Sequence, residues 1–155
     1  MKQLLTGLLL ALGVATVLAA TAQAKPATGP VVSLAKTGIG TVLVDQRGRT
    51  LYLFEKDRNG ISACNTSCLR YWPPLTSRAI PRAGKGVQQS LLRLGRTHNG
   101  VRQVTYAGHP LYAFVGDRRP GQTAGEGLDE FGGGWYVLSA NGQKIEHTTS
   151  GGYGY

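Results

Sequence analysis

The chain contains an internal repeat, and this repeat limits the possible folds more than any other feature. Residues 34–57 align without gaps on residues 94–117 at an offset of 60, and nine of the 24 aligned positions are identical. Each copy ends in the pattern Tyr-x-Phe-x-x-Asp, at residues 52–57 and 112–117. Self-similarity of this kind is typical of a duplicated supersecondary unit. We therefore expect two equivalent units that pack into one domain.

Each copy predicts a β-hairpin. In the first copy, the β-branched and apolar residues 41–45 precede a turn at 46–49 and a return strand at 51–54. In the second copy, strands at 101–106 and 111–115 flank the turn pair Ala107-Gly108. Both faces of the return strands are apolar, so these strands are expected to be covered on both sides.

A third hairpin is expected near the C-terminus, from residues 135–139 through the turn pair Asn141-Gly142 into residues 144–148. No long stretch has helical periodicity after the N-terminal segment. The predicted fold class is all-β with a minor helical turn, as two tandem β-hairpin repeats packed into one small domain.

The N-terminus predicts export. Lys2 precedes the apolar stretch Leu4 to Ala20, and Ala22-Gln23-Ala24 places small residues where signal peptidase reads them. The alternative is a retained membrane anchor, because the apolar stretch is near the lower limit for spanning a bilayer. We expect cleavage near Ala24 and a soluble product in the periplasm or outside the cell, with no transmembrane segment left in the mature chain.

The domain boundaries follow from the signal peptide and the repeat. Residues 1–24 form the signal peptide, 25–33 a disordered segment, 34–149 a single β domain and 150–155 a flexible tail. Within the domain the two repeats are expected at 34–80 and 90–138, followed by the C-terminal hairpin. The glycine-rich stretch 120–134 is predicted to be a mobile loop.

The mature chain is basic. Of the 17 Lys and Arg, only Lys2 is lost with the signal peptide, so the net charge of the mature chain is +8 once the 8 Asp and Glu are counted. Outside the cytoplasm a basic surface meets anionic lipids and acidic envelope polymers, so anionic envelope components are the expected partners. Nucleic acid is not an expected partner, because export separates the protein from it and no recognition motif is present. The sequence does not indicate an oligomeric state.

Cys64 and Cys68 are the only cysteines, and in an exported chain they are expected to form a disulfide across one helical turn. The alternative is a copper or redox site made by the two thiolates with His98 and His109, because soft ligands suit that metal. We expect the disulfide, and therefore no metal and no other cofactor.

The candidate site residues are the repeated motif positions: Tyr52, Phe54, Asp57, Tyr112, Phe114 and Asp117. The aspartates are expected to cap local turns, each accepting N–H bonds from the residues just after it. In the alternative, the tyrosines and aspartates of both copies converge on one polar pocket. Tyr71, Trp72 and Trp135 are a candidate aromatic binding face, although a tryptophan in such a position more often packs over the core.

These motifs together resemble a known family. The two Tyr-x-aromatic-x-x-Asp patterns, the segment Cys64 to Cys68 leading into Trp72-Pro73-Pro74, and the segment Gln103 to Gly108 are similar to the bacterial "secreted repeat" family of predicted lipoproteins. The resemblance implies an exported, duplicated protein and implies no particular activity. Many relatives carry a lipid on a cysteine, which this chain lacks near its predicted cleavage site.

No catalytic signature is present. The sequence has no G-x-S-x-G elbow, H-E-x-x-H pair, P-loop or dinucleotide fingerprint. We therefore expect no enzymatic activity and predict an envelope-associated binding or structural module. A copper- or redox-handling module using Cys64 and Cys68 is the second hypothesis, and a hydrolase the third.

Overall fold

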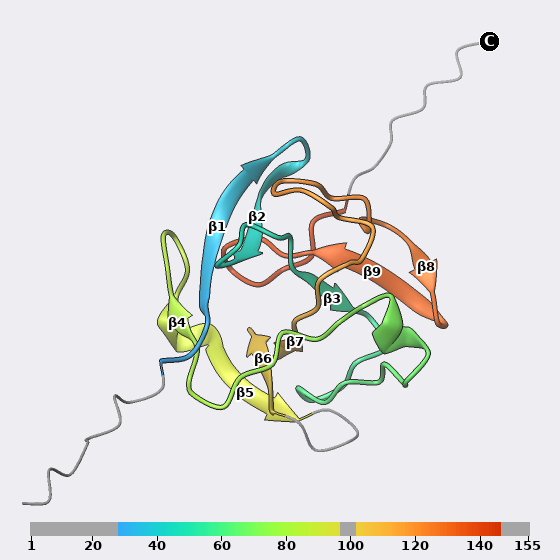
Figure 1. Cartoon of the computed structure of the whole chain (residues 1–155), viewed down its shortest axis with the longest axis horizontal. Coiled ribbons are helices and arrows are strands. Elements are labelled where there is room, and N and C mark those ends of the chain that lie inside the picture. Colours follow the sequence, from blue (N-terminus) through green and yellow to red (C-terminus); the bar gives the residue numbers. More distant parts are fainter. Residues whose placement is uncertain (1–27, 97–101, 147–155) are drawn as a thin grey trace, which may run out of the picture.

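The computed structural model describes residues 28–96 and 102–146 (Figure 1). Its elements are the strands β1 (Val31–Thr37), β2 (Gly40–Asp45), β3 (Tyr52–Phe54), β4 (Arg82–Ala83), β5 (Leu92–Arg96), β6 (Arg102–Tyr106), β7 (His109–Pro110), β8 (Asp129–Glu130) and β9 (Gly133–Val137), with the 3-10 turns η1 (Cys68–Arg70) and η2 (Gln89–Leu91). The predicted all-β class is confirmed. Within the described ranges, no helix has the length and apolar character needed to cross a membrane.

The strands form three small sheets, ordered β2-β1-β4, β3-β9-β8 and β5-β6-β7. All neighbouring strands are antiparallel except β1 and β4, which run parallel. The hairpins β1-β2 and β5-β6 are the corresponding parts of the two copies. The C-terminal hairpin was predicted from residues 135–139 into 144–148. β9 contributes to its first strand, and Leu138 forms a bridge with Lys144. Its continuation beyond residue 146 lies outside the described residues.

The two return strands were predicted to pair with the preceding strand of their own hairpin, and the structure shows other main partners. Segment 51–54 follows β2 only through a bridge between Val44 and Thr50 and a hydrogen bond from the Leu51 N–H to the Leu43 carbonyl at 2.9 Å. β3 then pairs with β9. Segment 111–115 is not a strand. β7, just before it, pairs with β6, and the Leu111 N–H donates to the Val104 carbonyl at 3.0 Å. Both segments are largely buried, so their backbone groups need partners on each side. The sequence could not show that these partners come from β9 and from the other copy.

The copies differ by one residue in register. Leu34 lies opposite Leu43 in the first hairpin, whereas its counterpart Leu94 lies opposite Val104 in the second. Val104 therefore takes the position of Leu43, although the ungapped alignment places it on Val44. The turn that follows restores the alignment, because it has three residues (46–48) in the first copy and two (107–108) in the second.

Alternation along β3 divides the interior into two cores. Tyr52 and Phe54 point into an aromatic core that also contains Trp72, Tyr112 and Trp135. On the opposite face, leucines and valines of both copies form an aliphatic core, which includes Leu43, Leu51, Leu53, Leu92, Val104 and Leu111. The prediction that these segments are covered on both faces is confirmed for residues 51–54, 111 and 112.

Two segments differ from their sequence predictions. Residues 31–33, predicted to be disordered, belong to β1, where Val32 is fully buried opposite Asp45. The stretch 120–134, predicted to be a mobile loop, contains β8 and is held by hydrogen bonds, such as that from the Thr50 hydroxyl to the Gln122 carbonyl at 2.6 Å. The predicted signal peptide lies outside the described residues.

Candidate functional site

The two Tyr-x-Phe-x-x-Asp motifs meet at their tyrosines. The Tyr52 N–H donates to the Tyr112 carbonyl at 2.8 Å, and the Tyr112 N–H donates to the Tyr52 carbonyl at 3.0 Å. Two residues that exchange both backbone bonds in this way lie directly opposite each other, with side chains on the same side. The copies are therefore related by an approximate two-fold axis that passes between these residues.

Each tyrosine binds the aspartate of the other copy. The Tyr52 hydroxyl donates to Asp117 Oδ2 at 2.6 Å, and the Tyr112 hydroxyl donates to Asp57 Oδ2 at 2.9 Å. We call this pair of bonds the reciprocal clasp. It joins residues 65 and 55 positions apart in the chain, so it links the two copies and not the parts of one copy.

The second oxygen of each carboxylate binds a loop of its own copy. Asp57 Oδ1 accepts the Ala63 N–H at 2.7 Å, and Asp117 Oδ1 accepts the Ala124 N–H at 2.8 Å. The aspartates were predicted to accept N–H groups from the residues just after them, but these donors lie six and seven residues away. Each aspartate therefore closes a longer loop and also joins the two copies. The alternative hypothesis brought the tyrosines and aspartates of both copies together, although as a polar pocket and not as a link between the copies.

Burial controls the electrostatics of the clasp. It raises the pKa of Asp117 above the ordinary value, against the opposing effect of the bonds from Tyr52 and Ala124. Burial, and then the neighbouring aspartate, raise the pKa of both Tyr52 and Tyr112 far above the usual 10.0. Both phenols therefore remain protonated donors at any physiological pH, as the clasp requires.

A column of four stacked rings crosses the two-fold axis. Phe54 stacks on Trp135 at 4.2 Å between centroids, Trp135 on Trp72 at 3.8 Å, and Trp72 on Phe114 at 4.4 Å. The clasp tyrosines stand edge-on to this column, Tyr52 against Trp72 and Tyr112 against Trp135, at 5.3 and 5.1 Å. Such pairs add to the free energy of burying the rings.

The predicted aromatic binding face does not exist as proposed. Trp72 and Trp135 are both 0 % exposed, because they form the centre of the ring column. Tyr71 alone lies at the surface, where it is 53 % exposed and 6.0 Å from the Phe131 ring. The structure thus places both tryptophans in the core, in equivalent positions of the two copies.

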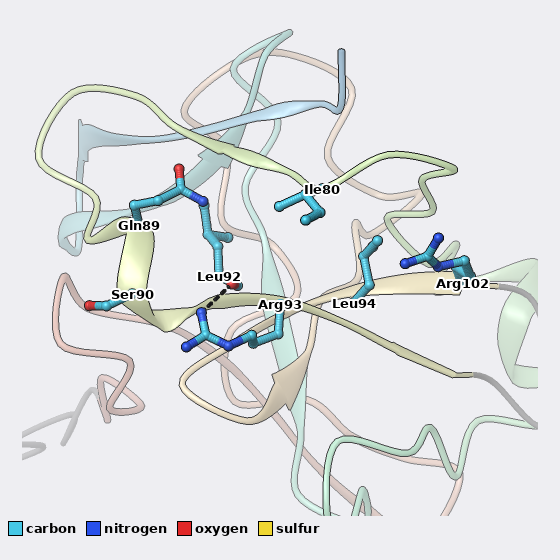
Figure 2. A pocket seen from close by; sticks show the side chains of 7 residues that line it. All are labelled: Ile80, Gln89, Ser90, Leu92, Arg93, Leu94 and Arg102. Carbon is cyan, nitrogen blue, oxygen red and sulfur yellow. Dashed lines mark hydrogen bonds between the residues drawn. The ribbon is translucent and has the colours of Figure 1, made fainter. Parts of the chain in front are cut away.

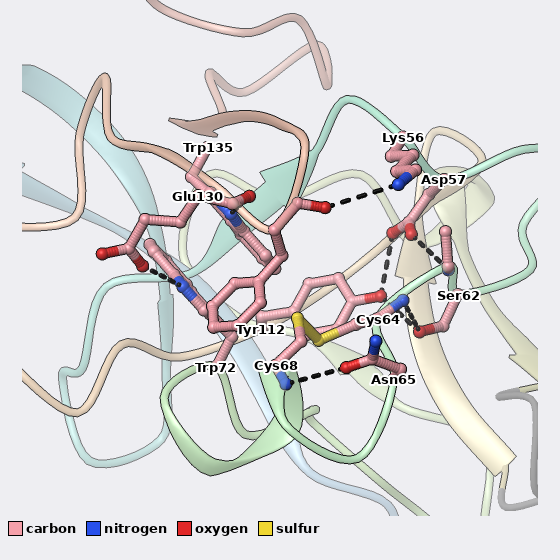
Figure 3. Close-up of a disulfide and its surroundings, with 12 residues drawn as sticks. Lys56, Asp57, Ser62, Cys64, Asn65, Cys68, Trp72, Tyr112, Glu130 and Trp135 are labelled. Carbon is pink, nitrogen blue, oxygen red and sulfur yellow. Dashed lines mark hydrogen bonds between the residues drawn. A yellow bond between two sulfur atoms is a disulfide. The ribbon is translucent and has the colours of Figure 1, made fainter.

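Cys64 and Cys68 form a disulfide beside the clasp, with their Cα atoms 5.3 Å apart (Figure 3). Asn65 accepts the Cys68 N–H at 3.1 Å and so caps the turn. Ser62 Oγ accepts the Cys64 N–H and lies 2.7 Å from the Tyr112 hydroxyl. The disulfide loop therefore supports one half of the clasp, and the other half has no such bridge.

The residues of the alternative copper site are not brought together within the described ranges. Disulfide sulfurs carry no thiolate charge for a metal, and His98 lies outside the described residues. His109 lines a separate hollow of about 310 Å³ with Asp57, Arg58 and Lys144, and burial lowers its pKa. In the part of the chain that the structure describes, no three His, Cys, Asp or Glu side chains are grouped for a metal ion.

Comparison with known proteins gives one family. A family model described as a secreted repeat of unknown function matches residues 33–76 and 95–139. The two matches fall on the two copies that the clasp joins. No curated protein and no solved structure matches the chain.

Proposed function

The chain belongs to this family of secreted repeats of unknown function, as its sequence motifs predicted, and from this premise we propose that it is an exported, non-enzymatic module that binds an anionic partner in the cell envelope. The proposed binding surface is the basic half of the domain, residues 58–116. The observation that carries the proposal is the separation of charge along the chain.

The basic half has no counter-charge of its own. Residues 58–116 contain eight Arg and Lys, all of those side chains are exposed, and there is no Asp or Glu in this stretch. The other described residues contain seven Arg and Lys against all 8 acidic residues. The ion pairs seen in the described ranges, such as Arg49 with Asp45 and Lys144 with Glu55, lie outside the basic half. Arg58 shares a hollow with Glu55 and Asp57, and no carboxylate lines the two hollows that contain Arg78, Arg93 and Arg102. An excess of positive charge of this kind attracts anionic partners.

The geometry of the motifs supports a non-enzymatic role. A catalytic tyrosine or aspartate must reach a substrate, whereas Tyr52 and Tyr112 are fully buried and donate to carboxylates within the core. Each carboxylate in turn holds a backbone N–H of a neighbouring loop. The repeated motif is thus used to join the copies, which leaves the surface for binding.

A pair of variants with equal charge tests the proposal. The triple variant R78Q/R93Q/R102Q removes three exposed cations from the basic half, and R47Q/R118Q/R119Q removes three exposed cations from the other half. We expect the wild-type protein to bind fluorescent poly-glutamate with an affinity that falls as salt rises. The first variant should bind much more weakly, and the second nearly as well as wild type. Equal loss in both variants, or no binding by wild type to any anionic probe, contradicts the proposal.

We also propose that cleavage after Ala24 releases the domain into the periplasm or the medium. The intact mass of the exported protein should correspond to a chain that starts at Lys25. A mass that includes residues 4–20 would instead support the retained anchor.

A further inference from the structure

Two adjoining hollows lie on the basic half and share Arg102. The first, about 530 Å³, is lined by Ile80, Leu92 and Leu94 together with Arg93 and Arg102 (Figure 2). The second, about 550 Å³, is lined by Arg78, Arg102 and two hydroxyl side chains. Neither lining contains a carboxylate. The surface therefore combines an apolar floor with three arginines, and we call it the Ile80 face.

Ile80 is held in an exposed position. It is 68 % exposed, more than any other large apolar side chain of the described residues. The Gln89 side chain braces the loop that carries it, donating to the Pro81 carbonyl at 3.0 Å and accepting the Ala83 N–H at 2.8 Å. On the other side, the Ser77 hydroxyl donates to the Ala79 carbonyl. Because the loop is fixed on both sides, Ile80 is held in its exposed position. Binding through Ile80 therefore does not require a further loss of chain entropy.

The chain enters the domain at this same face. A Cβ on Gly29 would lie 2.2 Å from the Ile80 carbonyl oxygen, so the two backbones are in direct contact. The Arg82 N–H donates to the Pro30 carbonyl at 2.9 Å. Only residues 21–27 separate the apolar stretch 4–20 from the described chain, and seven residues reach at most about 25 Å. Before the proposed cleavage after Ala24, this short connection keeps the Ile80 face within reach of the membrane that holds the apolar stretch. After cleavage, the domain has to bind through the face alone.

From these observations we infer that the Ile80 face is a contact site for an anionic phospholipid surface, with Ile80 entering the headgroup region and Arg78, Arg93 and Arg102 binding lipid phosphates. This inference rests on the proposed function and specifies its partner. A soluble polyanion matches the arginines but gives Ile80 nothing to contact. A membrane interface supplies both anionic headgroups and hydrocarbon, and long arginine side chains reach the headgroups while their stems remain in apolar surroundings.

Vesicle flotation tests the inference on the exported protein. The probes are vesicles of phosphatidylglycerol with phosphatidylcholine, vesicles of phosphatidylcholine alone, and soluble poly-glutamate. We expect strong binding to the anionic vesicles, weaker binding to poly-glutamate, and none to phosphatidylcholine alone. Basic residues near an anionic membrane each contribute about a fivefold gain in affinity, so R78Q/R93Q/R102Q should bind roughly 100-fold more weakly. I80S should bind about tenfold more weakly, from the lost apolar contact.

Two controls match these variants. R47Q/R118Q/R119Q removes the same charge elsewhere, and V115S replaces another exposed apolar side chain, 49 % exposed, outside the linings of both hollows. Both should bind anionic vesicles like wild type. All replaced side chains are exposed, and near-UV circular dichroism of the buried tryptophans confirms that each variant is folded.

Three results would overturn the membrane inference. If I80S binds vesicles as tightly as wild type, Ile80 makes no contact with the membrane and binding depends on charge alone. If poly-glutamate binds and anionic vesicles do not, the partner is a soluble polyanion. Both results leave the proposed function standing. If neither probe binds, the inference and the proposed function are both wrong.

Discussion

Replacing Tyr52 by phenylalanine removes one hydroxyl from the reciprocal clasp and leaves the ring in place. Two hydrogen bonds are lost: the donation to Asp117 Oδ2 at 2.6 Å, and the donation from the Gly125 N–H at 3.3 Å. Asp117 is only 7 % exposed, so water has little access to the oxygen that loses its partner. A hydrogen bond to a charged group contributes about 1.5–3 kcal/mol to the free energy of unfolding. Since a buried N–H also loses its partner, we expect a total loss of about 2–4 kcal/mol.

The equivalent change at Tyr112 should be milder. Asp57 is half-buried, so water can take the place of the lost hydroxyl. Ser62 Oγ, which lies 2.7 Å from the Tyr112 hydroxyl, can turn its own proton to another acceptor. We therefore expect Y112F to lower the free energy of unfolding by about 1 kcal/mol, despite the near-symmetry of the two sites.

Urea unfolding with the disulfide intact measures both changes, because Trp72 and Trp135 lie against the clasp and their fluorescence reports its loss. Y71F is the matched control: Tyr71 is 53 % exposed, and its replacement should change the free energy of unfolding by less than about 0.5 kcal/mol. The reasoning is refuted if Y52F is as stable as Y71F, or if Y112F costs more than Y52F.

Three further changes test neighbouring features. D117N should lower the free energy of unfolding by about 1–3 kcal/mol, because an amide has one acceptor oxygen for two donors. Burial raises the Asp117 pKa, so the stability that this carboxyl contributes to wild type is present below its unfolded pKa and is lost as pH rises through its folded pKa. In urea unfolding, the stability difference between wild type and D117N should therefore narrow from about pH 3 to pH 7, and a difference that widens contradicts this. Reducing the disulfide should lower the free energy of unfolding by about 2 kcal/mol, and Y112F should then cost less in the reduced protein than in the oxidised one. If Y112F costs the same in both, the disulfide loop does not support the clasp. G125A should lower the free energy of unfolding by about 1–3 kcal/mol, measured by thermal unfolding, because its Cβ would lie 2.7 Å from a buried indole ring. G38A is the control and should be close to neutral, because nothing lies within 4 Å of its Cβ. Equal effects of the two variants would contradict the packing argument.

The repeat and its buried aromatics were predictable from the sequence, and their connection across the copies was not. Alternation placed Tyr52 and Phe54 on one face, and that face is the aromatic core. The same alignment, however, is satisfied whether each tyrosine binds the aspartate of its own copy or of the other. Only the direct backbone pairing of Tyr52 with Tyr112 decides between these arrangements, and pairing between distant segments leaves no local pattern.

The errors in register and boundaries have local causes. An ungapped alignment keeps the turn glycines Gly48 and Gly108 together and therefore hides the one-residue shift before them. Val31 and Val32 follow proline- and glycine-containing residues, which favoured a disordered segment, but pairing of β1 with β2 and β4 outweighs that preference. The exposed position of Ile80 likewise depends on a brace from Gln89, nine residues away, which composition does not reveal.

The reciprocal clasp also bears on how such a chain can evolve. Duplicated domains usually diverge, because one copy can change while the other keeps the original role. Here each copy supplies the hydrogen-bond acceptor for the tyrosine of the other, so a substitution in one motif leaves a partner unsatisfied in its twin. We therefore expect selection to act on the two motifs together, because a change in either one lowers the stability of both copies. In this respect the two halves form a single unit, in which Tyr52 depends on Asp117 and Tyr112 on Asp57.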